Sequence, residues 1–185
     1  MLYDKMRRQR VTLVTGAIAS GKSEVCRYLA SLGYPVYDSD SRAKALYDTV
    51  PGLKSLIESE LGIPFNELSL IFRDESLRLR LESIVYPLLH KDFECWCDSC
   101  AETDASKRLF FESAIALDKF QFDDCYDDVL LVRADAGLRL GRNPKVAQRD
   151  SLQSFDLSKV NYIIENNTTI TNLHALVDKY LRETK

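Results

Sequence analysis

The chain has 185 residues, of which 45% are hydrophobic and 29% are charged. This length and composition are typical of one folded domain with a sizeable core, and they exclude a disordered chain or a fibre. The 25 basic and 28 acidic residues give a net charge of −3, so the chain as a whole does not attract nucleic acid or an anionic membrane. No stretch reaches the roughly 20 apolar residues of a membrane span, and the polar first residues predict no signal peptide. We therefore expect a cytoplasmic protein, and the sequence indicates no obligate protein partner.

Five cysteines, an odd number in a chain without an export signal, indicate reduced thiols rather than a disulfide framework. Cys95, Cys97 and Cys100, in ECWCDSC, have the spacing of a metal cluster. Zinc sites usually need four ligands in recognisable pairs, and neither Cys26 nor Cys125 has a partner at such spacing. We therefore expect these cysteines to pack along a helix.

Short runs of β-branched and aromatic residues alternate with longer stretches whose apolar positions are three and four apart. This alternation is typical of βαβ units and a parallel sheet. The expected strands are Val11–Thr15, Pro35–Tyr37, Arg108–Glu112, Val129–Arg133 and Tyr162–Glu165. The expected helices are Gly21–Leu32, Ser41–Tyr47, Ala134–Arg142 and Ile170–Arg182.

The long interval from Asp48 to Lys107 has a helical pattern throughout, with Pro87 expected to mark a break or a new first turn. No repeat, low-complexity tract or linker separates it from the rest of the chain. We therefore expect a single domain over residues 1–185, with a helical insertion at about 48–107 that forms a lobe beside the ligand crevice.

One stretch after the first expected strand reads G-A-I-A-S-G-K-S and satisfies the pattern G-x-x-x-x-G-K-[S/T] in full. In such a loop the backbone N–H groups and the following helix N-terminus hold phosphate oxygens, while the lysine reaches the β and γ phosphates. The serine hydroxyl ligates Mg²⁺. A plain helix start would explain the glycines and a serine but not the Lys-Ser pair. Ser23 is the expected ligand of Mg²⁺. The expected nucleotide-binding residues are Gly16, Ala17, Ile18, Ala19, Ser20, Gly21, Lys22 and Ser23.

Carboxylates end two of the expected strands at the crevice edge where open α/β sheets bind ligands. Asp40, in YDSDS, is the candidate base that accepts a proton from an acceptor hydroxyl. Asp38 fits a turn or helix cap better. Glu112 could hold Mg²⁺ through water or contact the acceptor, although a solvated strand end fits almost as well.

Basic residues follow the fourth strand: Arg139, Arg142, Lys145 and Arg149. Arg139 and Arg142 are one helical turn apart, so both could face one anion from a mobile lid at about residues 139–153. A solvated helix with a basic end is the alternative. After the last strand, Asn166 and Asn167 suit a turn into a helix that a threonine could cap, and Asn167 could also contact a bound base.

These motifs in this order resemble the dephospho-coenzyme A kinase family. The matching stretches are VTGAIASGKSEVCRYLASLGYPVYDSD, LESIVYPLLH, FFESAIALDKF, RLGR, RDSLQ and VNYIIENN. The resemblance implies a three-layer α/β/α P-loop kinase fold with a five-stranded parallel sheet, an inserted helical substrate lobe and a short lid. It also implies transfer of phosphate from ATP, with Mg²⁺, to the ribose 3′-hydroxyl of dephospho-coenzyme A. The residues carried over are Asp40 as the acidic residue that activates the 3′-hydroxyl, Lys22, Arg139 and Arg142 as further catalytic residues, and Arg149 with Gln153 as the R-x-x-x-Q that follows the two arginines.

Several positions depart from the family pattern. Ala17 and Ala19 stand where glycines are usual, and Tyr86 stands where the family has histidine before Pro87. The stretch around residues 65–72 is shortened, and the two lid arginines are one residue closer than usual. A kinase of another small metabolite, or a catalytically weak nucleotide-binding module, therefore remains an alternative at this point.

Overall fold

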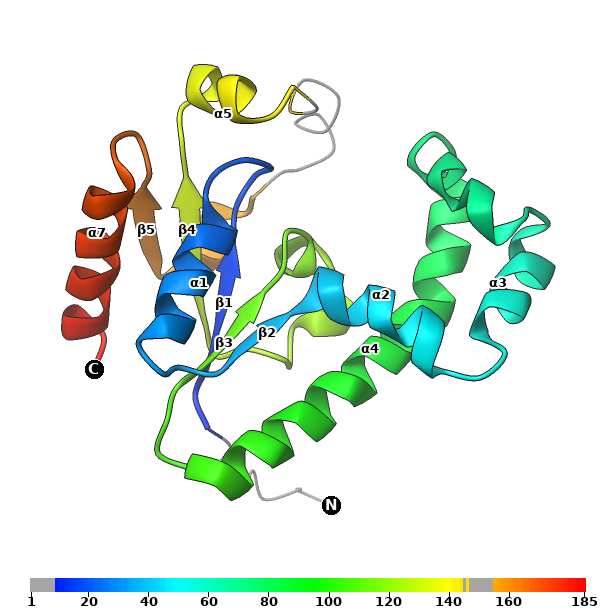
Figure 1. The fold of residues 1–185 in the computed structure, drawn as a ribbon, viewed down its shortest axis with the longest axis horizontal. Coiled ribbons are helices and arrows are strands. Elements are labelled where there is room, and N and C mark those ends of the chain that lie inside the picture. Colours follow the sequence, from blue (N-terminus) through cyan, green and yellow to red (C-terminus); the bar gives the residue numbers. More distant parts are fainter. Residues whose placement is uncertain (1–8, 145, 147–154) are drawn as a thin grey trace. The chain divides into compact units, whose positions relative to one another are not determined.

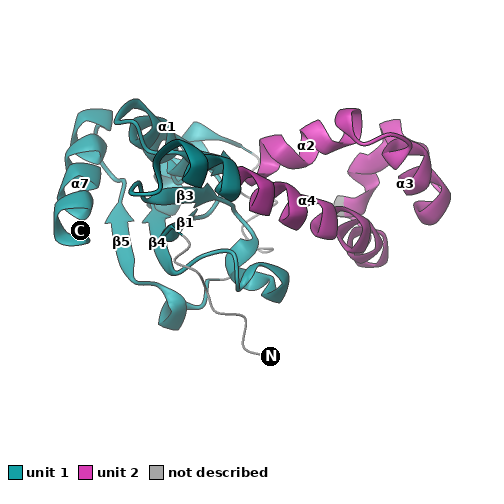
Figure 2. Cartoon of the chain, turned by 90° about the horizontal axis from the view of Figure 1, so that it is seen from below, with its two compact units in different colours: residues 1–38, 97–185 teal, residues 39–96 magenta. Residues whose placement is uncertain are grey.

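The computed structural model describes residues 9–144, 146 and 155–185 (Figure 1). Its contacts divide the chain into two compact units (Figure 2), which we describe separately. The sheet unit comprises residues 1–38 and 97–185, and the helical unit comprises residues 39–96. In the sequence, the helical unit is therefore an insertion into the sheet unit.

The sheet unit is built on five parallel strands in the order β2-β3-β1-β4-β5 (Figure 1). The strands are β1 Val11–Thr15, β2 Val36–Asp38, β3 Leu109–Glu112, β4 Asp128–Arg133 and β5 Tyr162–Glu165. All five predicted strands are confirmed, with ends that differ by at most one residue. Every residue of β1 and β3 is buried, which explains why these strands read as continuous apolar runs.

Helices α1 (Lys22–Ser31) and α7 (Ile170–Glu183) pack on one face of the sheet. The Thr169 side chain caps α7 by accepting a hydrogen bond from Asn172 N, as the sequence suggested. The two helices and the strands form one core cluster, whose buried members are Val14, Val25, Cys26, Leu29, Phe110, Leu130, Val132, Ile164, Leu173, Val177 and Tyr180.

Aromatic side chains pack on the opposite face of the sheet. The Phe111 ring of β3 contacts the rings of Tyr37 and Phe122, with centroids 5.8 and 6.0 Å apart. Phe122 lies in one of two short 3₁₀ turns that follow β3, η2 (Ala116–Asp118) and η3 (Phe120–Phe122). The other connections of this unit contain α5 (Ala136–Arg142), directly after β4, and the 3₁₀ turn η5 (Leu157–Lys159).

The helical unit contains α2 (Ser39–Thr49), α3 (Leu53–Leu61), the 3₁₀ helix η1 (Phe65–Phe72) and most of α4 (Glu75–Asp104). Its buried side chains include Leu53 and Ile57 of α3 and Leu81 and Val85 of α4. Arg42 of α2 donates two hydrogen bonds to Asp92 of α4, Nε to Oδ2 at 2.7 Å and Nη2 to Oδ1 at 2.5 Å. This bidentate pair ties the first helix of the unit to its longest one.

The break predicted at Pro87 is wrong, because α4 runs through this residue without ending. Proline lacks the N–H that would bond to the Ser83 carbonyl, so it weakens a helix at this turn. Buried side chains lie on both sides of it, Leu81 and Val85 before and Leu89 and Phe93 after. Their burial offsets the lost hydrogen bond, and a local sequence rule takes no account of that packing.

All five cysteines are free thiols, as expected. Cys95, Cys97 and Cys100 lie along α4, where Cys95 is exposed and the other two are half-buried. In the described part of the chain, no helix combines the length and the apolar character that crossing a membrane requires.

Candidate active site

The loop Gly16–Ser23 joins the end of β1 to the start of α1 (Figure 1). Its glycines are required by close approach as well as by conformation, with φ of +155° at Gly16 and +104° at Gly21. A Cβ on Gly16 would lie 2.2 Å from the Val132 carbonyl oxygen, and a Cβ on Gly21 would lie 2.2 Å from Asn166 Nδ2. The loop therefore packs directly over the carboxyl ends of β4 and β5.

The two alanines of the loop differ in their backbone conformation. Ala19 has φ +61° and is the one non-glycine residue with positive φ in the described ranges, whereas Ala17 does not share this conformation. A side chain in the left-handed region costs about 1 kcal/mol or more. Of the two alanines in the loop, Ala19 is thus the one that stores strain.

Helix α1 begins at Lys22 with a glycine at its N-cap and no side-chain cap. Gly21 O accepts from Glu24 N and Val25 N, which starts the regular helix. The first N–H groups of a helix have no partner within it and carry partial positive charge. The amino end of α1 therefore offers donors to an anion.

Ser23 and Glu112 form a pair at the base of the loop. The Ser23 hydroxyl donates to Glu112 Oε1 at 2.7 Å, and the Glu112 side chain is buried at the end of β3. Beneath them, burial and the neighbouring Glu112 carboxylate raise the pKa of the Cys26 thiol, which keeps it protonated and hydrogen-bonded to that carboxylate. Hydroxyl and carboxylate oxygens are the ligands that Mg²⁺ prefers, so the pair fits a magnesium site.

Asp38 and Asp40 fall in different units. Asp38 ends β2 and pairs in register with Glu112 of β3. Asp40 lies in the first turn of α2 with an exposed side chain, and it belongs to the helical unit. The other predicted site residues that the structure describes belong to the sheet unit.

The two arginines of α5 have different contacts. Arg142 donates from Nη1 to Ala19 O at 3.2 Å and from Nη2 to Asn166 O at 3.1 Å. Arg139 donates from Nε to Ala134 O at 3.1 Å and lines a hollow of about 460 Å³ beside Ala17. Arg142 therefore bridges α5 to the phosphate loop. Lys145 and residues 147–153 of the predicted lid, which include Arg149 and Gln153, lie outside the described residues.

The asparagines after β5 contact two different elements. Asn166 is buried, and its Nδ2 donates to the Ser20 carbonyl at 2.8 Å. Asn167 pairs with Asp135, the N-cap residue of α5, through Asp135 N to Oδ1 at 2.9 Å and Nδ2 to Asp135 Oδ1 at 3.1 Å. The sequence reasoning missed the contact of Asn166 with the loop. Its signal was an amide directly after an apolar strand, at the sheet edge where the loop also lies.

Tyr86, which replaces the histidine of the family pattern, is buried in α4. Burial raises the pKa of its hydroxyl most, and the Glu82 carboxylate that accepts its hydrogen bond raises the pKa further. Arg78 opposes this rise and Asp40 adds to it. Tyr86 is therefore a neutral hydrogen-bond donor in the same helical unit as Asp40.

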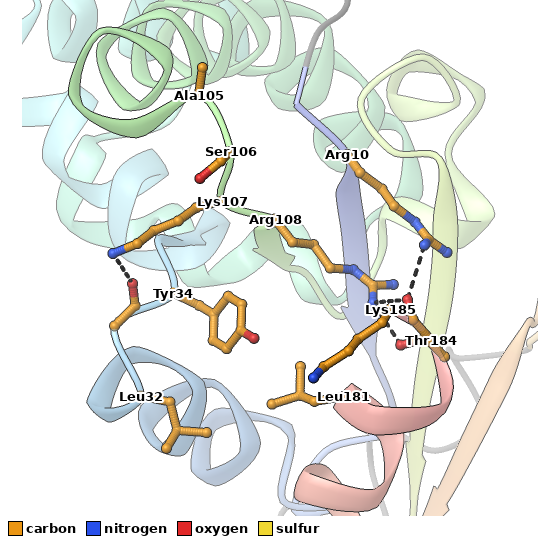
Figure 3. A pocket seen from close by; sticks show the side chains of 11 residues that line it. Arg10, Leu32, Tyr34, Ala105, Ser106, Lys107, Arg108, Leu181, Thr184 and Lys185 are labelled. Atoms are coloured by element: carbon orange, nitrogen blue, oxygen red, sulfur yellow. Dashed lines mark hydrogen bonds between the residues drawn. The ribbon is translucent and has the colours of Figure 1, made fainter.

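A hollow of about 510 Å³ lies away from the loop, at the amino-terminal ends of β1 and β3 (Figure 3). Its cationic side chains include Lys107, which donates to Gly33 O at 3.0 Å. They also include Arg108, which donates to Thr12 Oγ1 and Asp128 Oδ1 at 2.6 Å each. These donors join strands and turns of the sheet unit, so we assign this hollow to the architecture.

Comparison with known proteins decides the family. The model of the dephospho-CoA kinase family matches residues 10–60, which contain both the loop and Asp40. A dephospho-CoA kinase from Porphyromonas gingivalis is 36% identical over 138 residues, covering 70% of this chain and 66% of that relative. One from a Synechococcus species is 32% identical over 156 residues, covering 76% of this chain and 74% of that relative. The chain belongs to the dephospho-CoA kinase family.

Solved structures agree on the fold of this family member. A crystal structure from Thermus thermophilus superposes with a TM-score of 0.75 at 24% identity, covering 97% of this chain and all of that one. Dephospho-CoA kinase from Campylobacter jejuni gives a TM-score of 0.63 at 17% identity, covering 94% and 96%. Shikimate kinase from Acinetobacter baumannii gives 0.53 at 18% identity, covering 95% and 92%. The predicted P-loop kinase fold is thus confirmed.

Proposed function

We propose that this chain transfers the γ-phosphoryl group of ATP to the ribose 3′-hydroxyl of dephospho-coenzyme A, which yields coenzyme A and ADP. Membership of the dephospho-CoA kinase family supports this proposal. The observation that carries it is the Ser23–Glu112 pair below a complete phosphate loop, since a kinase needs both a phosphate grip and a metal position.

On the donor side, the loop N–H groups and the amino end of α1 bind the phosphates of ATP. Lys22 reaches the β and γ phosphates. Ser23 and Glu112 would hold Mg²⁺, Glu112 directly or through water, and the ion would supply positive charge that neutralises the phosphate oxygens. The Ser23 hydroxyl and the Glu112 carboxylate supply the oxygen atoms that this metal site needs at the base of the loop.

On the acceptor side, Asp40 accepts the proton of the 3′-hydroxyl. The hydroxyl oxygen forms its bond to the γ phosphorus while the bond between that phosphorus and the ADP oxygen breaks. The helical unit provides the acceptor site. It contains Asp40, which lies in the first turn of α2, the helix that directly follows β2. Phosphoryl transfer depends mainly on positioning, so a carboxylate on the first turn of a helix suits the role.

Arg139 and Arg142 stabilise the charge of the transferring group, and Asn167 contacts the base of the nucleotide. Arg142 uses one N–H of Nη1 for Ala19 O and one of Nη2 for Asn166 O, and its guanidinium carries further N–H groups that can donate to a phosphate oxygen. The five free thiols are consistent with a reducing compartment, and we propose that the enzyme acts in the cytoplasm.

The experiment that tests the role of Asp40 is the variant Asp40→Asn, assayed for coenzyme A formation with Mg-ATP. We expect kcat to fall by about 100-fold or more, because a general base contributes on that order, while ATP binding stays unchanged. Asp48→Asn, the same change at the far end of α2, is the matched control and should keep full activity. Full activity in Asp40→Asn would reject this carboxylate as the base.

A further inference from the structure

We infer that Asn166 is a positioning residue of the phosphate loop, which orients the Gly21 N–H by holding the Ser20 carbonyl. This inference rests on the proposed function, because it concerns how the loop binds ATP. Asn166 follows β5 and is only 7% exposed, yet its Nδ2 reaches a loop 146 residues earlier in the chain at 2.8 Å.

Peptide geometry makes this contact directional. The described peptide bonds are all trans, and in a trans peptide the C=O and the following N–H point in opposite directions. Asn166 holds the Ser20 C=O on the side of β5. The Gly21 N–H therefore points to the other side of the loop, where a phosphate oxygen can accept it.

The environment of the amide shows that this position suits asparagine. Asn166 is anchored by its own backbone, with Asn166 N donating to Arg133 O at 2.7 Å. Gly21 makes room for the amide, since a Cβ there would lie 2.2 Å from Nδ2. The buried Ser20 carbonyl needs a donor, which an aspartate carboxylate at position 166 could not supply.

Arg142 extends the contact to the neighbouring peptide. It donates to Ala19 O and to Asn166 O, so one guanidinium holds both the loop and the residue that orients it. Ser20 N closes a turn onto Ala17 O at 3.1 Å, which fixes the peptide that Arg142 contacts. Asn167 meanwhile holds the N-cap residue of α5. The turn after β5 thus joins the phosphate loop to the helix that carries both lid arginines.

The test compares ATP binding by Asn166→Asp with that of the wild type, measured by calorimetry. Aspartate has nearly the same shape but no donor for Ser20 O, so we expect about tenfold weaker ATP binding. The KM for ATP should rise in parallel, while the KM for dephospho-coenzyme A stays unchanged. Asn166→Ala removes the donor without adding charge and should show the same loss, which covers the case that the aspartate variant does not fold.

Asn161→Asp is the matched control at the other end of β5. Asn161 Oδ1 accepts from Val129 N at 2.8 Å, and a carboxylate oxygen keeps that contact. We expect wild-type ATP affinity in this variant. Position-166 variants that melt earlier but bind ATP within twofold of the wild type would overturn the inference and leave Asn166 a purely structural residue.

The outcome also separates this inference from the proposed function. A wild type that binds ATP but forms no coenzyme A would contradict the proposed acceptor, and the comparison of Asn166 variants would still decide the positioning role. A wild type that binds no ATP would contradict both. Weaker ATP binding in Asn166→Asp together with coenzyme A formation by the wild type would support both.

Discussion

Ser23 and Glu112, 89 residues apart in the sequence, meet in a 2.7 Å hydrogen bond at the carboxyl end of β3. Glu112→Gln keeps an oxygen that accepts from Ser23 but removes the negative charge. If the pair holds Mg²⁺, the variant should need about tenfold more free Mg²⁺ for half-maximal activity, because the affinity for the cation falls when a ligand loses its negative charge. A titration of activity against free Mg²⁺ measures this effect. An unchanged Mg²⁺ requirement would remove Glu112 from the metal site.

Glycine substitutions at the two alanines of the loop should change the free energy of unfolding in opposite directions. Ala19→Gly removes a Cβ from a residue at φ +61° and should raise the free energy of unfolding by about 1 kcal/mol. Ala17→Gly, at a position without positive φ, should lower it by about 0.5–1 kcal/mol because glycine has more freedom in the unfolded chain. Urea unfolding of both variants measures the two changes. Equal effects at the two positions would contradict the strain at Ala19.

The Cys26 thiol makes stability depend on pH. An unfolded cysteine ionises near pH 8.5, whereas burial and the Glu112 carboxylate raise the pKa of the folded thiol. Above about pH 8.5 only the unfolded chain loses this proton, so the free energy of unfolding falls by up to about 1.4 kcal/mol per pH unit. Cys26→Ala should remove this part of the fall between pH 8 and pH 10 in urea unfolding. Cys95→Ala, at an exposed position, should keep the wild-type slope, and equal slopes in all three proteins would refute the effect.

Arg108, in the hollow of Figure 3, should matter for stability and not for catalysis. Its side chain is 12% exposed and pairs with an Asp128 side chain that is 9% exposed, so Arg108→Met leaves a buried carboxylate with less compensation. We expect a loss of about 3 kcal/mol in the free energy of unfolding. Arg27→Met, which removes an exposed pair with Glu24, should have little effect. A raised KM for ATP in Arg108→Met at a temperature where it is folded would argue against a purely architectural role.

Most of the sheet could be predicted from the sequence because each buried parallel strand is a short continuous run of apolar residues. The loop Gly16–Ser23 could be predicted for the same reason, since its motif is contiguous and its strand and helix flank it directly. Helix α4 shows the limit, because the buried residues around Pro87 outweigh the local effect of proline. Contacts between segments that are distant in the sequence could not be predicted either. The Asn166 amide on Ser20 O and the Arg142 guanidinium on Ala19 O depend on how three separate connections meet above the sheet.

Identification of the phosphorylated product tests most directly whether dephospho-coenzyme A is the acceptor of the phosphoryl group. The purified chain is incubated with Mg-ATP and dephospho-coenzyme A, and in parallel with AMP, CMP or shikimate, and the products are identified by mass and by ³¹P NMR. We predict one product, coenzyme A with its new phosphate on the ribose 3′-oxygen, formed in step with ADP. Phosphorylation of another acceptor in preference to dephospho-coenzyme A, or ATP binding without transfer to any of the four, would contradict the account.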